Sequence, residues 1–214
     1  ALIIFSHNIL ALMFLFFSLS YILLLIHREK NKKYLILSTF CVILLGLGVS
    51  SVFWLPAIYE TKFATGLQIF DIAAHFPELY QLIFPSWGSG FSGGDIQNQM
   101  SFQIGVGNLI AVFISCIITV FLIFKKDRNI KLIIFFIFWF FLNIFLMLKT
   151  SLIVWQKVPL MNYFQFPWRF LSLEIIVSSF LAGSIVYFWK SKILAILLIS
   201  LVFFLGVGYA KPAY

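Results

Sequence analysis

The sequence predicts an all-α fold, a polytopic membrane helical bundle with about six transmembrane helices. Apolar and aromatic residues make up 63% of the 214 residues and charged residues only 10%, whereas soluble domains contain roughly 25% charged residues. The apolar residues also form long uninterrupted runs without the alternation of membrane strands, and such runs favour helices. A chain of this composition belongs in a lipid bilayer.

Six apolar runs are candidate membrane spans, because a helix rises about 1.5 Å per residue and about 20 residues cross the hydrocarbon layer. They cover approximately residues 2–26, 34–55, 102–124, 132–148, 168–189 and 193–209. We interpret residues 1–214 as a single transmembrane domain. The chain starts in apolar sequence, without Met or the pattern of a signal peptide, so we expect it to be the later part of a longer protein.

The basic residues predict the orientation of the spans. The short loops 27–33, 125–131 and 190–192 hold ten of the fifteen Lys and Arg residues but two of the seven acids. By the positive-inside rule these loops are cytoplasmic, which places both chain ends and the loops 56–101 and 149–167 outside a cell membrane. The net charge of +8 is therefore a topology signal, and no nucleic-acid partner is expected.

Both long external loops are expected to carry short interfacial helices. The first loop combines a glycine-rich turn region, FPSWGSGFSGGD, with a segment of near-helical apolar spacing that Pro77 interrupts. The spacing residues are Leu67, Phe70, Ala74 and Glu78. The second loop predicts a short helix at the membrane surface, with Trp155 and Tyr163 as interface anchors.

Arg169 and Glu174 are the strongest candidate site residues. Pro167 suits a first helical turn, so Arg169 lies at a helix N-terminus, where a bound anion would be favourable. Arg169 also fits a simpler role, reaching lipid phosphates at the interface. Glu174 is an ionisable residue inside the span, and such residues line cavities or meet partners on other helices. A protonated or hydrogen-bonded structural Glu174 is the alternative.

His7 and Asn8 are further candidates, because SHN interrupts an apolar run with polar residues that either line a cavity or bond between helices. No cluster of ligands accompanies His7, so no metal site is expected and no cofactor is identified. Asp95 more often shapes a turn than binds a metal. A helical contact of His75 with Glu78 would be interrupted by Pro77.

Two pairs of small residues predict close helix packing, Gly46 with Ser50 and Ser179 with Gly183. Cys41 and Cys116 lie inside apolar runs and are expected to be buried hydrophobic residues, with no disulfide between them.

Five segments in order, FSHNILALMFL, GLGVSSVFWLPAIYETKF, LYQLIFPSWGSGFSGG, MSFQIGVGNLIAV and VPLMNYFQFPWRFLSLE, resemble bacterial membrane proteins with a "6-pyruvoyl-tetrahydropterin synthase-related" domain. Those proteins are similar to YfhO-like and other GT-C-type glycosyltransferases. The resemblance implies transfer of a sugar from a polyprenyl-phosphate donor at the outer face. It also implies a catalytic carboxylate in an external loop upstream of Ala1. By their own chemistry and position in the sequence, Arg169 suits contact with lipid phosphate, and His7 and Glu174 suit the cavity wall.

Two other functions remain open from the residues. A transporter or flippase of lipid-linked substrates would need polar residues through the membrane and broken helices near its midplane. The polar residues here gather at the outer ends, with Asn143 as the main exception. A non-catalytic membrane scaffold is the third possibility.

Overall fold

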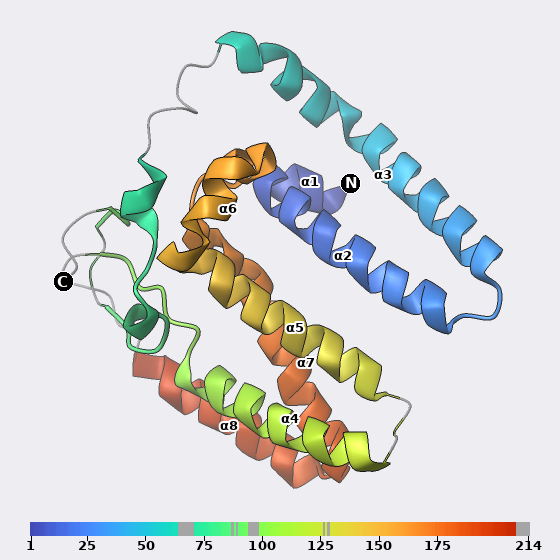
Figure 1. The fold of residues 1–214 in the computed structure, drawn as a ribbon, viewed down its shortest axis with the longest axis vertical. Helices are drawn as coiled ribbons and strands as arrows, with labels where there is room; N and C mark the ends of the chain where they lie inside the picture. Colours follow the sequence, from blue (N-terminus) through green and yellow to red (C-terminus); the bar gives the residue numbers. More distant parts are fainter. Residues whose placement is uncertain are drawn as a thin grey trace. The chain divides into compact units, whose positions relative to one another are not determined.

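The computed structural model describes residues 1–63, 71–86, 88, 90–93, 99–125, 127 and 129–208. The described part is helical apart from loops and one isolated bridge between Gly90 and Gln99, which confirms the all-α fold class (Figure 1). The α-helices are α1 (Leu2–Ser6), α2 (Asn8–Arg28), α3 (Lys32–Glu60), α4 (Val106–Lys125), α5 (Ile130–Met147), α6 (Leu152–Lys157), α7 (Leu171–Trp189) and α8 (Lys192–Val207). The short 3₁₀ turns are η1 (Thr61–Phe63), η3 (Ile72–His75), η4 (Leu79–Leu82), η5 (Lys149–Ser151), η6 (Pro159–Phe164) and η7 (Pro167–Phe170).

Five helical segments of the described residues are long and apolar enough to cross a membrane. They are α2, α3, α4, α5 and the segment Pro167–Trp189, which joins η7 to α7. The sixth predicted span appears as α8, which has 16 residues and a length of about 24 Å at 1.5 Å per residue. Its predicted end, Tyr209, lies outside the described residues. These helices define a multi-pass membrane protein.

The chain forms two compact units, Ala1–Phe70 with Tyr163–Gln165, and Asp71–Asn162 with Phe166–Tyr214. In the first unit, α2 and α3 run antiparallel and α1 packs on both (Figure 1). The predicted first span is wrong in one respect, because it is broken at His7, whose backbone is extended (φ −165°, ψ 109°). The polar residues at this point cap helix ends instead of continuing one helix.

The second predicted span is longer than expected. Helix α3 continues through Pro56 to Glu60, so the external loop does not begin at residue 56. Pro56 removes one backbone donor from the helix interior, but the helix tolerates this loss. The predicted packing of Gly46 with Ser50 is confirmed, because Ser50 is fully buried and the backbone nitrogen of Ala1 lies 3.5 Å from the position of a Cβ on Gly46.

The second unit is a bundle in which α7 packs against α4 and α5, while α8 packs on α4 and α7. Small residues allow the close contact between α4 and α7: the Ser115 hydroxyl donates to the Leu181 carbonyl at 2.8 Å and lies 3.3 Å from the Ser184 hydroxyl. Phe136 of α5 stacks on Phe180 of α7, with ring centroids 3.6 Å apart. Small and hydroxyl-bearing residues are typical of such membrane-helix interfaces.

Two details of this bundle differ from the sequence-based expectation. Ser179 and Gly183 are exposed, and no described atom lies within 4 Å of a Cβ built on Gly183, so their predicted packing is wrong. Helix α4 begins at Val106 instead of Phe102, because Gly105 has a positive φ of 97° that ends the extended segment before it.

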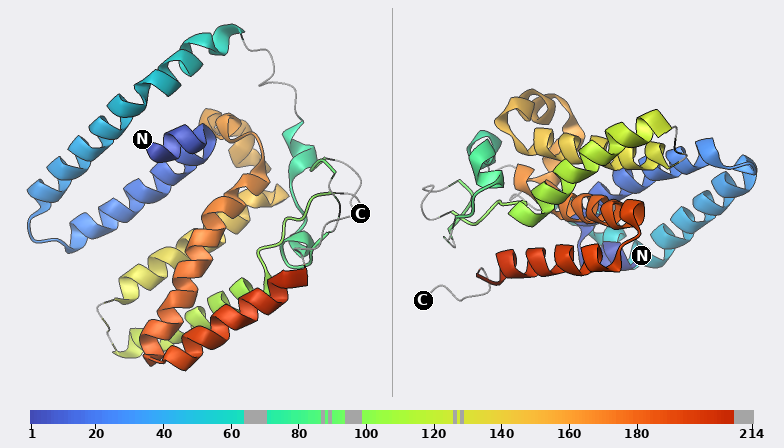
Figure 2. Two further views of the ribbon diagram at one scale, coloured as in Figure 1. Left: turned by 180° about the vertical axis from the view of Figure 1, so that it is seen from behind. Right: turned by 90° about the horizontal axis from the view of Figure 1, so that it is seen from below.

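The second unit has two basic turns, the connection between α4 and α5 and the connection between α7 and α8. Both lie at the same end of its bundle (Figure 2). Asn129, between α4 and α5, donates to the Tyr187 hydroxyl near the end of α7 at 3.1 Å. Lys125 lies 5.9 Å from the centre of the Phe188 ring. The start of α7, with Arg169 and Glu174, is therefore near the opposite end, as the predicted alternation of basic and outer loops requires within this unit.

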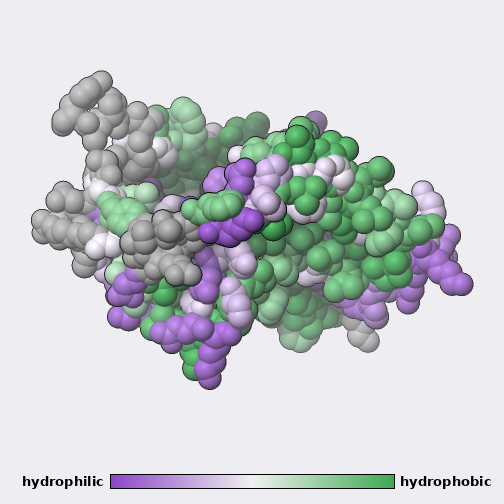
Figure 3. Space-filling view, turned by 90° about the horizontal axis from the view of Figure 1, so that it is seen from above, coloured by the Kyte–Doolittle hydropathy of each residue, from purple (hydrophilic) through white to green (hydrophobic). Residues whose placement is uncertain are grey.

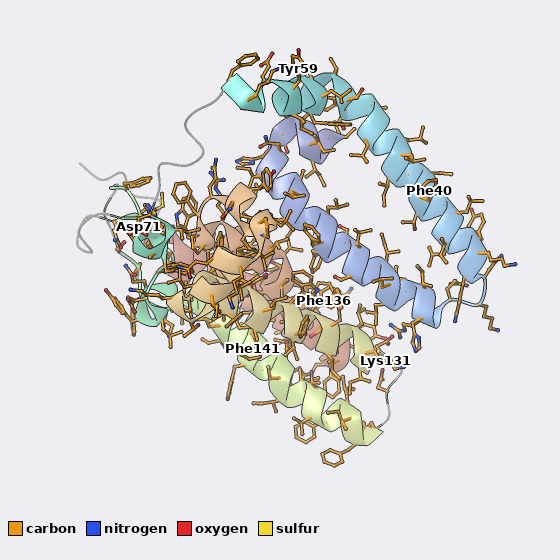
Figure 4. All side chains as sticks on the ribbon, turned by 45° about the horizontal axis from the view of Figure 1, so that its top comes forward. Phe40, Tyr59, Asp71, Lys131, Phe136 and Phe141 are labelled. Atoms are coloured by element: carbon orange, nitrogen blue, oxygen red, sulfur yellow. The ribbon has the colours of Figure 1, made fainter. Side chains whose placement is uncertain are left out.

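Apolar side chains cover much of the helix surface. Figure 3 shows broad continuous areas of apolar residues on one face of the protein. Phe40 on α3 and Phe141 on α5, both labelled in Figure 4, are 57% and 56% exposed. An aqueous surface rarely exposes apolar patches of this extent, whereas a lipid-facing surface requires them.

Candidate functional site

The candidate site lies where α5 ends and α7 begins, at the end of the second unit opposite its basic turns. The chain between these helices forms η5, α6, η6 and η7. Trp155 of α6 is 1% exposed and donates its indole N–H to the Leu146 carbonyl at 3.0 Å. Its ring packs edge-on against Phe76 and Phe170. Trp155 is therefore a core residue, and its predicted role as an interface anchor is wrong, whereas Tyr163 is exposed.

Glu174 meets a partner on another helix. Glu174 is 1% exposed and Asn143 of α5 is fully buried. The Asn143 side-chain nitrogen donates to Glu174 Oε2 at 3.0 Å. The hydroxyl of Ser178 donates to the backbone carbonyl of Glu174 at 2.7 Å, one turn further along α7. The expectation of a partner on a neighbouring helix is thus fulfilled, and a role in binding substrate stays a prediction.

Arg169 lies in η7, immediately before α7, and is half-buried. Its guanidinium carbon lies 5.2 Å from the centre of the Phe166 ring and 5.9 Å from that of the Trp168 ring. The two rings stack on each other with centroids 5.5 Å apart. Trp168 Nε1 is buried and has no hydrogen-bond partner among the described residues. This aromatic platform orients the guanidinium at the start of the helix.

His7 and Asn8 belong to the first unit, and each has a local structural role. His7 is the N-cap of α2, and its Nδ1 accepts from the Leu10 backbone N–H at 3.3 Å. Asn8 Oδ1 accepts from the Ile9 N–H at 2.8 Å. Both side chains are exposed. Because Arg169 and Glu174 belong to the second unit, the four predicted site residues do not form one cluster within either unit.

The loop between α3 and α4 contains a buried polar cluster that the sequence pattern did not indicate. His75 Nδ1 lies 2.8 Å from the Ser92 hydroxyl, and the ring packs edge-on against Phe91 and Phe166. The ring also lies so close to Gly93 that a Cβ there would be 2.8 Å from His75 Cε1. The contact of His75 with Phe166 joins the loop between α3 and α4 to the segment that precedes Arg169.

A glutamine pair extends this cluster. The Gln81 side-chain nitrogen donates to Gln99 Oε1 at 2.9 Å, and the Gln99 side-chain nitrogen donates to the Ser92 carbonyl at 3.1 Å. The predicted interfacial helix is replaced in the described part by η3 and η4, with Pro77 between them. Glu78 takes part in the capping box of η4 with Gln81. Leu67, Phe70 and Asp95 lie outside the described residues.

Burial lowers the pKa of His75 below its ordinary value of 6.5, and the negative charge of Asp71 opposes this effect. The fold therefore prefers neutral His75. Its stabilising contribution is complete above pH 6.5 and is lost as the pH falls through the lowered pKa of the folded state.

We therefore expect acidification below pH 6.5 to lower the protection factors of the backbone amides in residues 71–86 of the intact protein, that is, their exchange measured relative to the intrinsic rate at each pH. The reason is that protonating His75 places a charge among Phe91 and Phe166. A His75→Gln variant is expected to lose this pH dependence. The control His27→Gln, at an exposed histidine, should retain it. Equal pH dependence in all three proteins would contradict the assignment.

Two signals for this site are visible in hindsight. A short amide residue in the middle of an apolar helix, as at Asn143, is a candidate partner for an acid in another span. A histidine followed by a glycine-rich turn, as at His75 and Gly93, permits close backbone approach to the ring. No group of three or more His, Cys, Asp or Glu side chains within the described ranges is placed to hold a metal ion.

The fold and the site thus define a multi-pass, all-α membrane protein with a polar cluster at one end of its second unit. The chain matches no family model, no curated protein and no solved structure.

Proposed function

We propose that the second unit binds the phosphate of a polyprenyl-phosphate-linked sugar at the outer membrane face, as part of a GT-C-like glycosyltransferase. The observation that carries the phosphate assignment is the placement of Arg169. Its guanidinium rests beside Phe166 and Trp168 at the start of the segment that forms α7.

The groups at this position favour an anion. Arg169 carries five N–H donors in a planar fork that matches phosphate oxygens. The buried Trp168 Nε1 adds a donor that has no partner among the described residues. The N-terminal end of α7 adds a partial positive charge. A negatively charged headgroup rich in hydrogen-bond acceptors would complement this arrangement of charge and donors.

The surroundings favour a ligand with an apolar chain. Ile175 and Ile176, which follow on α7, are 60% and 43% exposed. A phosphate at Arg169 would therefore be next to surface that suits hydrocarbon. The basic turns at the other end of the unit support placing Arg169 on the outer side. The sugar and its transfer rest on the sequence resemblance to GT-C-type enzymes.

Arg169→Ala in the intact protein is expected to weaken binding of polyprenyl phosphate about 10- to 100-fold, because a hydrogen bond to a charged group contributes about 1.5–3 kcal/mol. Native mass spectrometry in detergent measures the binding, and a transfer assay with labelled donor measures turnover. The matched control is Lys157→Ala, since Lys157 is an exposed cation of the same chain segment between α5 and α7.

The test separates the specific proposal from ordinary lipid contact. Wild-type binding and turnover in Arg169→Ala would remove Arg169 from the mechanism. An equal loss of binding to phosphatidylglycerol vesicles and to polyprenyl phosphate would show that Arg169 contacts membrane phosphates in general. Tight binding of polyprenyl phosphate without any sugar transfer would favour a scaffold or a flippase over a transferase.

A further inference from the structure

Asn143 and Glu174 form a buried polar pair, which is independent of phosphate binding. The two side chains connect α5 and α7 in the interior of the second unit, and both are at most 1% exposed. They share one hydrogen bond, from the Asn143 side-chain nitrogen to Glu174 Oε2, with a length of 3.0 Å.

The two side-chain oxygens that do not take part in this hydrogen bond are both acceptors. Asn143 Oδ1 and Glu174 Oε1 are buried and have no hydrogen-bond partner among the described residues. An amide oxygen and an ionised carboxylate can only accept hydrogen bonds. An ionised Glu174 would therefore leave two buried acceptors without a donor and a charge in an apolar environment, which costs several kcal/mol.

No described cation is positioned to neutralise the pair directly. The elements packed against α7, the helix that carries Glu174, are α4, α5, α8 and η7. Their titratable residues, with Tyr187 of α7 itself, are Cys116, Lys125, Lys131, Arg169 and Lys192. Lys131, labelled in Figure 4, lies at the beginning of α5. It precedes Asn143 by twelve residues, or about 18 Å of helix. Arg169 precedes Glu174 by five residues, which corresponds to a rotation of about 140°.

We propose that Glu174 and Asn143 form a buried proton-binding site, in which Glu174 is a neutral carboxylic acid at neutral pH. A proton on Glu174 Oε1 converts one of the two unpartnered acceptors into a donor. The protonated Oε1 of Glu174 can then donate a second hydrogen bond to Asn143 Oδ1, beside the existing bond from the Asn143 side-chain nitrogen to Oε2. The amide and the acid then each donate once and accept once, which satisfies both groups without a charge.

With this proton bound, α5 and α7 are joined by an uncharged pair of hydrogen bonds close to the candidate phosphate site. Loss of the proton would leave an ionised carboxylate in the bundle and would separate or hydrate the two helices at this point. The site therefore couples helix packing at the start of α7 to the binding of one proton.

Infrared spectroscopy of the intact protein, labelled with ¹³C-glutamate, tests this proposal. The other glutamates, Glu29, Glu60 and Glu78, are exposed, whereas Glu174 is buried. We expect the wild-type protein to show a protonated carboxylic-acid C=O band that shifts with the label and in D₂O. Glu174→Gln should abolish this band, while the control Glu60→Gln should leave it unchanged.

The absence of a labelled carboxylic-acid band from wild-type protein at neutral pH would overturn the proposal. A band that persists in Glu174→Gln would also overturn it. A sodium ion is the competing occupant of two adjacent acceptor oxygens, and it predicts no acid band and a melting temperature that falls when sodium is replaced by choline. Because none of these readouts involves polyprenyl phosphate, failure here is distinguishable from failure of the proposed function.

Discussion

Replacing Trp155 with alanine is expected to lower the free energy of unfolding by about 3–5 kcal/mol, the usual range for a large buried aromatic side chain. Trp155 is 1% exposed and packs against Phe76 and Phe170. Its indole N–H also donates to the Leu146 carbonyl near the end of α5. The substitution would leave a cavity next to Phe76 and Phe170 and would remove the hydrogen-bond donor of the Leu146 carbonyl. Denaturation of purified protein in detergent measures the change.

Two further variants separate the contribution of packing to this loss of stability from that of the hydrogen bond. Trp155→Phe retains most of the packing but loses the hydrogen bond, so its expected loss is about 1–2 kcal/mol. Trp189→Ala is the matched control, because Trp189 at the end of α7 is 52% exposed and should be nearly neutral. If Trp155→Ala and Trp189→Ala had equal small effects, Trp155 would be an interface anchor, as the sequence first suggested.

Asn143→Leu is expected to destabilise the second unit by about 1–3 kcal/mol, because it leaves the buried Glu174 carboxyl without its partner. Leucine has a similar volume, so little of this loss would come from packing. The double variant Asn143→Leu/Glu174→Leu should recover much of the lost stability, since two apolar residues leave no buried polar group unpaired. Unfolding of all variants in one detergent gives the coupling energy.

Additive effects of the single substitutions would contradict this expectation, because additivity means that the side chains do not interact. Measured interhelical hydrogen bonds in membranes contribute about 0.6 kcal/mol on average and up to about 1.7 kcal/mol. A coupling energy within or above this range would support the observed pair.

The helical architecture was predictable because few backbone conformations are stable in lipid. Backbone groups in hydrocarbon must bond internally, so a long apolar run becomes a helix whatever its neighbours do. Pro167 correctly indicated the start of the span that contains Arg169. The ends of the spans were less predictable, because His7, Pro56 and Gly105 act through local backbone geometry that hydropathy does not record.

The candidate site was only partly predictable. Glu174 was identifiable from its depth in an apolar run, since an ionisable residue is costly there and usually has a partner or lines a cavity. Its partner was not identifiable, because Asn143 is 31 residues away and spacing within one helix says nothing about the facing helix. Trp155 shows the same difficulty, because surface and core tryptophans look alike in sequence.

Composition and the length of the apolar runs were enough to establish an all-α membrane protein with multiple spans, because these two properties decide how a chain inserts into lipid. Its alternating basic loops also predict an orientation. Three features became apparent only in the packed fold: Asn143 contacts Glu174, His75 is buried against Ser92, and Trp155 belongs to the core. These contacts depend on the rotation and register of each helix against its neighbours, which uniform apolar surfaces leave open.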